Sequence, residues 1–277
     1  MPRWDRDELD EQYAESDNLD ARIALHANYS TAETDLHRWL FERYDLPSDA
    51  DVLELGCGTG RLWVENAERV PAAWTLTLTD RSAGMVEETR TAVSDALADA
   101  DRDAVDGPDG SDRPGTRFAR VDAASVPVDD DSVDAVVANH MLYHVPDRET
   151  AYAEIRRVLR PGGRLYAATN GDSHLAELGE YVTEALGEDH EFHSAMAGFT
   201  LESAGDELRA QFEDVRVERH PNGLRVPDPE PLVAYAASMT DRSEAEVAAL
   251  ARVAEERTAD GPFEARKDTG VFVVQVA

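Results

Sequence analysis

The chain has 277 residues and a net charge of −31, with 58 acidic residues against 27 arginines and lysines. Its single cysteine, Cys57, excludes an intramolecular disulfide and any cysteine-based zinc cluster. No apolar run reaches the roughly 18 to 20 residues of a membrane-spanning helix. The first residues also lack the apolar core of a signal peptide, so we expect a cytoplasmic protein without a membrane partner.

The excess of acidic residues predicts a protein from a halophile. Arginine supplies nearly all of the positive charge, because Lys267 is the only lysine. In molar salt the Debye length falls to about 3 Å, which screens the repulsion among acidic groups. Nucleic-acid binding needs local positive charge, so we expect no nucleic-acid partner. That inference is weaker in a halophile, whose proteins are acidic whatever they bind.

Two helices are predicted before the first strand. Residues 1–18 are highly charged, which predicts a frayed end. Apolar residues then recur at roughly helical spacing over residues 20–44, with an interruption near residues 28–31. We interpret residues 1–45 as N-terminal lid helices.

Residues 52–60, with the sequence VLELGCGTG, join an apolar strand to a turn with glycine at alternate positions, Gly56, Gly58 and Gly60. Glycine permits positive φ and lets a ligand approach where a Cβ would intervene, and the following helix would point unpaired N–H groups at that ligand. The pattern predicts a turn that binds a nucleoside-type cofactor. Loops also collect glycine for conformational reasons, so the prediction requires further binding residues at suitable spacing along the chain.

A second strand is predicted over residues 75–80. It alternates β-branched and apolar residues and ends in Asp80, twenty residues after Gly60. A second parallel strand would place this carboxylate against ribose hydroxyls. Beyond the next helix, residues 98–115 are acidic and rich in glycine and proline. With too little apolar content to pack, they are interpreted as a solvated, dispensable insertion.

Three more strands continue a βαβ series. The third ends in Asp122 and Ala123, although Asp122 could instead be a helix N-cap. The fourth is fully apolar and opens into Asn139 and His140, and the fifth follows a helix end and a Pro-Gly-Gly turn. These strands lie in residues 117–127, 133–145 and 157–170.

The regular alternation stops after the fifth strand. In an open α/β sheet, ligands bind beyond the carboxyl ends of the strands, so we interpret the helical patterns of residues 171–211 as a cap over that crevice. The remaining residues, 212–277, contain C-terminal strands and helices. Strands are expected at 212–220 and 270–277, and helices at 227–239 and 243–257.

The sequence ELGCGTG, the acidic end of the second strand and the PGG turn resemble the class I S-adenosylmethionine-dependent methyltransferases, over roughly residues 20–277. The resemblance implies an α/β fold, with a Rossmann-like, doubly wound and mostly parallel sheet whose last strand is antiparallel. It implies a single domain over residues 1–277, with the cofactor-binding core at 46–170. Arg61 follows Gly60 and breaks the dinucleotide pattern G-x-G-x-x-G, which favours S-adenosyl-L-methionine over NAD.

The resemblance also implies the cofactor site. The glycine turn would lie under the methionine part of the cofactor, Asp80 would hold the ribose, and Asp122 with Ala123 would flank the adenine. Glu54 either touches the ligand or orients the turn, and Cys57 is expected to be a small buried filler rather than a nucleophile. The predicted cofactor-binding residues are Glu54, Gly56, Cys57, Gly58, Gly60, Asp80, Arg81, Asp122, Ala123 and Asn139.

Methyl transfer from a sulfonium needs the nucleophile held at near-attack distance with water excluded, so a strong base is optional. An imidazole near its unperturbed pKa of about 6.5 could take a proton from the acceptor. A structural hydrogen-bonding role is an open alternative for each histidine. No histidine pair combines the helical i, i+4 spacing with the acidic partner expected of a zinc-binding helix, so no metal is expected. The candidate catalytic residues are His140, His144, His174 and Tyr29.

We therefore predict methyl transfer from S-adenosylmethionine to a small-molecule acceptor by a monomeric enzyme. Asn139 is followed by His140 and Met141, not by the Pro-Pro-aromatic sequence that marks many base-methylating enzymes. An RNA or protein methyltransferase is one alternative, and three clustered arginines, Arg156, Arg157 and Arg160, would suit it unless they form salt bridges. A non-catalytic S-adenosylmethionine-binding protein and, more remotely, an NAD-dependent oxidoreductase are the others.

Overall fold

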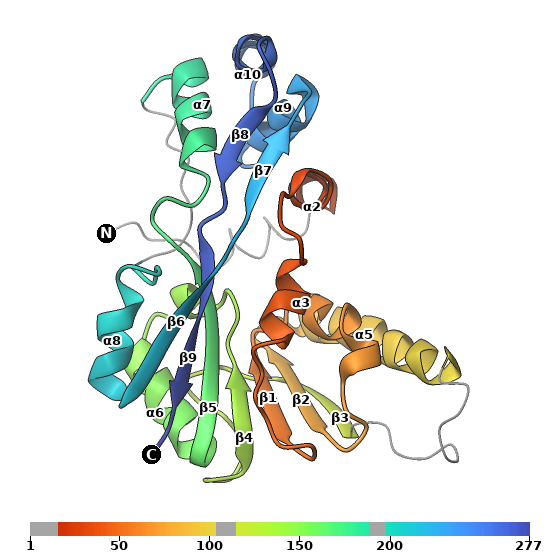
Figure 1. Ribbon diagram of the computed structural model, residues 1–277, viewed down its shortest axis with the longest axis vertical. Helices are drawn as coiled ribbons and strands as arrows, with labels where there is room; N and C mark the ends of the chain where they lie inside the picture. Colours follow the sequence, from red (N-terminus) through yellow and green to blue (C-terminus); the bar gives the residue numbers. More distant parts are fainter. Residues whose placement is uncertain (1–15, 104–114, 189–197) are drawn as a thin grey trace. The chain divides into compact units, whose positions relative to one another are not determined.

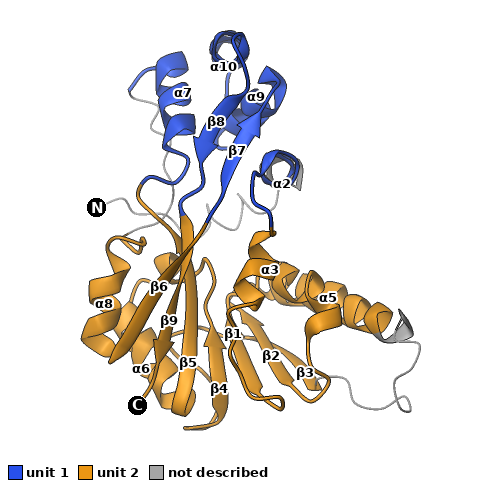
Figure 2. Ribbon diagram, viewed as in Figure 1, with its two compact units in different colours: residues 1–33, 173–194, 221–268 blue, residues 34–172, 195–220, 269–277 orange. Residues whose placement is uncertain are grey.

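The computed structural model describes residues 16–103, 115–188 and 198–277. It divides into two compact units, coloured separately in Figure 2. Unit 1 comprises residues 1–33, 173–194 and 221–268, and unit 2 comprises residues 34–172, 195–220 and 269–277. Residues 1–15 of the predicted frayed end and residues 104–114 of the predicted insertion lie outside the described residues, whereas residues 98–103 belong to a helix.

Unit 2 is built on a seven-stranded sheet with the order β3-β2-β1-β4-β5-β9-β6 (Figure 1). The pairs from β3 to β5 are parallel, and β9 runs antiparallel to both of its neighbours. This confirms the Rossmann-like, mostly parallel sheet with an antiparallel last strand. The strands are β1 (Asp51–Leu55), β2 (Thr75–Asp80), β3 (Gly115–Arg120), β4 (Val133–Val137), β5 (Leu159–Asn170), β6 (Asp214–His220) and β9 (Thr269–Gln275).

Helices cover both faces of this sheet, because successive side chains of each strand point to opposite faces. Val52 of β1 packs in one core with the tryptophans of α3 and α4, whereas Leu53 packs in a second core with residues of α6 and α8. Burial on both faces explains the nearly continuous apolar runs of the central strands. The helices of unit 2 are α3 (Leu36–Phe41), α4 (Arg61–Val64), α5 (Ala83–Asp103), α6 (Arg148–Val158) and α8 (Ala204–Gln211), with 3-10 turns η1 (Ala67–Arg69) and η2 (Leu142–His144).

The third strand is shorter than predicted. β3 ends at Arg120, and the chain turns directly afterwards, where the Ser125 N–H donates to the Asp122 carbonyl oxygen at 2.9 Å. No helix lies among the described residues between β3 and β4. The alternative interpretation of Asp122 as a helix N-cap was therefore wrong.

Unit 1 combines a short antiparallel two-stranded sheet, β7 (Gly223–Val226) and β8 (Phe263–Arg266), with four helices (Figure 1). Residues of the helices and both strands share one apolar core that includes Leu25, Tyr181 and Leu250. Among the described residues, no helix has the length and apolarity to cross a membrane. The helices are α2 (Ser16–Tyr29), α7 (Ala176–Leu186), α9 (Pro229–Ala237) and α10 (Glu244–Thr258).

Candidate cofactor site

The glycine-rich turn begins directly after β1 and needs glycine at three positions. Gly56, Gly58 and Gly60 have φ angles of 71°, 55° and 76°, a region that residues with a Cβ rarely adopt. A Cβ added at Gly56 would lie 2.7 Å from the Cβ of Met141, and one added at Gly60 would lie 2.8 Å from Cγ2 of Val93. At Gly58 it would meet nothing within 4 Å. The turn is thus packed at both ends and open in the middle.

Asp80 ends β2 beside this open position. Its Oδ2 accepts a hydrogen bond from the Gly58 N–H at 3.1 Å, and its Oδ1 accepts one from the Ser82 N–H at 2.8 Å. The two bonds fix the orientation of the carboxylate. Each oxygen retains a further lone pair for a ligand hydroxyl, and the predicted contact of Asp80 with a ribose stays a prediction.

Glu54 lies beneath the turn and is only 3 % exposed. Its Oε2 accepts a hydrogen bond from the indole N–H of Trp63 at 2.6 Å, which joins β1 to α4. Burial disfavours the charged form and raises the pKa of Glu54 to about 7, although the indole bond opposes this shift. This arrangement favours the interpretation that Glu54 orients the turn.

Cys57 is buried inside the turn, with its Sγ 3.5 Å from Oγ1 of Thr89. Burial, reinforced by the charge of Glu54, raises the pKa of its thiol to about 12. The thiol is therefore protonated at neutral pH, as expected of a filler rather than a nucleophile. Thr89 also donates to the carbonyl oxygen of Gly58. Sequence reasoning missed this residue, because nothing distinguishes a threonine inside a long helix.

Asn139 and His140 follow the end of β4 and are tied to β5. The Ala168 N–H donates to Oδ1 of Asn139 at 3.2 Å, and the His140 N–H donates to the Ala168 carbonyl oxygen at 2.8 Å. His140 has a φ of 54°, unusual for a residue with a Cβ. Nδ2 of Asn139 donates to the hydroxyl of Tyr44 at 3.1 Å. Sequence reasoning did not single out Tyr44, which lies 95 residues away.

The segment after β4 also carries His144, which belongs to η2. Its ring stacks edge-on against Tyr143, with 4.5 Å between the ring centroids. Part of His144 is exposed, but desolvation of the ring and the positive charge of Arg81 lower its pKa, while Asp80 opposes that effect. The Arg81 carbonyl oxygen accepts from Nε of Arg120 at 2.7 Å.

Asp122 and Ala123 form a turn beyond β3. Asp122 is exposed, and its Oδ1 accepts from the Ala124 N–H at 3.0 Å, whereas Ala123 is buried. The candidate residues around the carboxyl ends of the parallel strands therefore come from separate segments of unit 2. The contacts of Asp122 and Ala123 with an adenine stay a prediction.

Two catalytic candidates, His174 and Tyr29, belong to unit 1. Nδ1 of His174 lies 3.1 Å from the Asp268 carbonyl oxygen. Burial, with the positive charge of Lys267, lowers the pKa of His174 to about 4. Tyr29 ends α2 and packs against the apolar core of unit 1. A catalytic role for either residue stays a prediction.

Comparisons with known proteins identify the segment that carries this site. Residues 53–167 match a protein family described as methyltransferase domain. Methyltransferase GfsG of Streptomyces halstedii is 36% identical over 129 residues, which cover 47% of this chain and 41% of GfsG. The malonyl-[acyl-carrier protein] O-methyltransferase of Methylococcus capsulatus is 32% identical over 176 residues, which cover 62% of this chain and 55% of the relative. The chain thus spans about half the length of the curated relatives that it matches.

A solved structure shares the fold over nearly the whole chain. It is a complex between the Haloferax volcanii Trm112 methyltransferase activator and a methyltransferase, and it matches with a TM-score of 0.56 at 20% identity, covering 98% of this chain and 96% of that one. The glycine turn and Asp80 both fall inside the segment that matches the family. Residues 53–167 therefore match a methyltransferase domain.

Proposed function

We propose that the chain is an S-adenosylmethionine-dependent methyltransferase that acts on a small-molecule acceptor in the salt-rich cytoplasm of a halophile. The observation that carries this proposal is the pairing of an open Gly58 with the fixed carboxylate of Asp80, inside a methyltransferase domain. A turn packed at both ends and open at its centre suits the approach of a ligand to the backbone.

The residues of the turn suit the chemistry of S-adenosylmethionine. Asp80 offers acceptor atoms for ribose hydroxyls, and Gly58 lets a ligand approach the main chain without a side chain in the way. The buried Ala123 offers an apolar surface for an adenine ring, and the exposed Asp122 carboxylate can accept from its amine. In this proposal Glu54, Cys57 and Thr89 act behind the turn and keep its shape.

When bound, S-adenosylmethionine supplies a methyl group on a sulfonium, which is already activated toward a nucleophile. This chain then has to orient the acceptor, exclude water and, for some acceptors, remove a proton. His144 suits the last task in unit 2, because its lowered pKa keeps its imidazole neutral, and so able to accept a proton, at neutral pH. We propose His140 as a further residue of the acceptor site in unit 2, and a catalytic role for His174 or Tyr29 of unit 1 stays a prediction.

The clustered arginines on and after α6 favour a small acceptor over RNA, because each of them is bonded to a partner within unit 2. Arg157 pairs with Glu154 and Asp130, and Arg160 pairs with two aspartates at the start of β1 and β4, at 2.6 and 2.7 Å. Arg156 donates to the carbonyl oxygen of Gln211 at 3.0 Å. These cations are committed to partners within unit 2, so the cluster offers little free charge to a phosphate backbone.

One relative, by its name, acts on a malonyl group attached to a carrier protein. An acyl group on a carrier protein is a small acceptor, but its labelled product would have the size of a protein. The chemical nature of the labelled product therefore has to be determined as well as its size.

Calorimetric titration in molar KCl with S-adenosylmethionine, S-adenosylhomocysteine and NAD tests the cofactor. We expect micromolar binding of the first two and none of NAD. Binding of NAD alone, or of no compound, would contradict the proposal.

Transfer of a labelled methyl group from S-adenosylmethionine into size-fractionated cell extract tests the acceptor. Label is expected in the small-molecule fraction, with RNA and carrier proteins separated beforehand. Label confined to RNA or protein would replace the small-molecule acceptor with the corresponding macromolecule. Cofactor binding without any transfer would favour a non-catalytic binding protein.

A further inference from the structure

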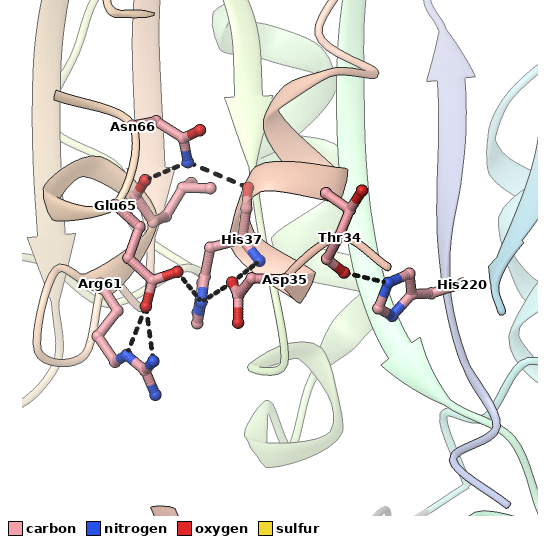
Figure 3. Close-up of polar contacts among 8 residues, drawn as sticks. Thr34, Asp35, His37, Arg61, Glu65, Asn66 and His220 are labelled. Atoms are coloured by element: carbon pink, nitrogen blue, oxygen red, sulfur yellow. Dashed lines mark hydrogen bonds and ion pairs between the residues drawn. The ribbon is translucent and has the colours of Figure 1, made fainter. Parts of the chain in front are cut away.

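One histidine and two carboxylates meet at a place in unit 2 that the methyltransferase proposal does not use (Figure 3). Nδ1 of His37 lies 3.3 Å from Oδ1 of Asp35 and 3.6 Å from Oε2 of Glu65. Asp35 caps the N-terminus of α3, and Glu65 follows the end of α4. One possible ligand atom from each of the three residues lies within 4.8 Å of the others.

The spacing around His37 fits a shared metal ion. Zinc binds nitrogen and carboxylate oxygen at about 2.0 to 2.2 Å, so neighbouring ligand atoms in a tetrahedral site lie about 3.3 to 3.6 Å apart. Both measured distances agree with that separation. Nδ1 of His37 is buried and has no well-directed hydrogen bond, although both carboxylates face it. A buried ring nitrogen in that state needs a proton or a cation between it and the carboxylates.

Neighbouring groups hold each of the three side chains in place. Arg61 binds Oε1 of Glu65 through Nε and Nη2, at 3.1 and 2.6 Å, which leaves Oε2 facing His37. Oδ1 of Asp35 accepts from the His37 N–H at 2.8 Å, and the His37 carbonyl oxygen accepts from Nδ2 of Asn66 at 3.1 Å (Figure 3). Such outer partners orient metal ligands in known sites.

We propose that Asp35, His37 and Glu65 bind a divalent first-row transition-metal ion, with Zn²⁺ as the best match and water completing its coordination. Two carboxylates and a neutral imidazole balance the charge of such an ion, and the mixed oxygen and nitrogen donors suit Zn²⁺ better than Mg²⁺. The ion would tie the start of α3 to the end of α4, the helix that follows Gly60 of the cofactor turn. This site departs from the absence of a metal expected from the sequence.

A proton is the competing occupant. Burial of the ring opposes protonation, but contacts with Asp35 and Glu65 outweigh it and raise the pKa of His37. Only a direct measurement of metal binding separates the two occupants.

Calorimetric titration of the metal-stripped full chain with ZnCl₂ and MgCl₂ tests the site. We expect one Zn²⁺ per chain to bind, with no binding of Mg²⁺ at the same concentrations. His37→Gln should weaken Zn²⁺ binding at least about tenfold, and Glu65→Gln should weaken it in the same way. Visible absorption of Co²⁺ in the same titration reports nitrogen and oxygen coordination independently.

Glu68→Gln is the matched control, because it removes one exposed acidic charge three residues from Glu65 without touching the cluster. It should bind Zn²⁺ as the natural chain does. Retained binding of S-adenosylhomocysteine shows that each variant is folded, and the metal titration stands whatever the methyl acceptor is. The absence of saturable Zn²⁺ binding, or equal binding by folded His37→Gln, would overturn the proposal.

Discussion

Asp80 tests the cofactor site most directly at the scale of a single residue. Its carboxylate accepts from two backbone N–H groups and lies beside the open glycine of the turn. Asp80→Asn keeps the size of the side chain but removes the charge and one acceptor oxygen. We expect it to weaken binding of S-adenosylhomocysteine by about 1 to 3 kcal/mol, measured by calorimetry.

Glu87→Gln serves as the control for this variant, because it removes one exposed charge from α5. It should bind the cofactor as the natural chain does. Unchanged affinity in Asp80→Asn would show that the end of β2 does not hold the ribose.

Alanine substitutions at two glycines of the turn should distinguish a loss of stability from a loss of cofactor affinity. Gly56→Ala and Gly58→Ala both place a Cβ at positive φ, at a cost of about 1 to 2 kcal/mol. Only Gly56→Ala also brings a Cβ to 2.7 Å from Met141, which should add about 1 to 3 kcal/mol of overpacking. Denaturant unfolding should therefore show Gly56→Ala as the less stable variant.

Gly58→Ala should instead lose cofactor affinity, because its Cβ would occupy space that is open to a ligand. A Gly58→Ala protein that binds S-adenosylhomocysteine normally would place the ligand elsewhere.

At the scale of elements, the buried bond between Glu54 and Trp63 joins β1 to α4 and predicts a pH dependence of stability. The pKa of Glu54, about 7 in the folded protein, lies above the roughly 4.3 of an unfolded glutamate. The folded state therefore holds this proton more tightly. Its contribution is fully present below about pH 4 and is lost as the pH rises through 7.

Unfolding in guanidinium chloride at pH 5 and pH 8 measures this contribution. Between those values the natural chain should lose about 2 to 3 kcal/mol that Glu54→Gln does not lose, because glutamine cannot titrate. The exposed variant Glu87→Gln should behave as the natural chain does. The same pH dependence in all three proteins would show that Glu54 does not titrate in this range.

The strands of the parallel core could be predicted from sequence, whereas unit 1 was predicted only in part. β2 ends at Asp80 as expected, because alternation followed by an acidic residue is a local signal. The two-stranded sheet of β7 and β8 was missed, because each strand has four residues and the two are separated by α9 and α10. Strands this short carry too few residues for a period to be recognised.

At the scale of the whole molecule, the net charge of −31 predicts that salt stabilises the fold. Surface ion pairs are worth about 0 to 1 kcal/mol each, and salt weakens them. Repulsion among the excess acidic groups is summed over the whole surface, so its screening should dominate. The thermal midpoint should rise as KCl increases from about 0.1 M to molar concentration, where the Debye length is about 3 Å.

Sucrose at the same osmolality provides the control, because it adds no ions. It should raise the midpoint less than KCl does. A midpoint that falls with added KCl would show that the ion pairs outweigh the repulsion and would remove the argument for a halophile.

The sequence by itself determined the succession of strands in the βαβ series, the need for glycine in the turn and the position of Asp80, because these features depend on residues close together in the chain. Only the tertiary structure decided that Thr89 and Tyr44 contact the site, that Glu54 bonds to Trp63, and that His37 meets two carboxylates. These contacts join residues from separate elements, and their distances result from packing, which no local pattern encodes.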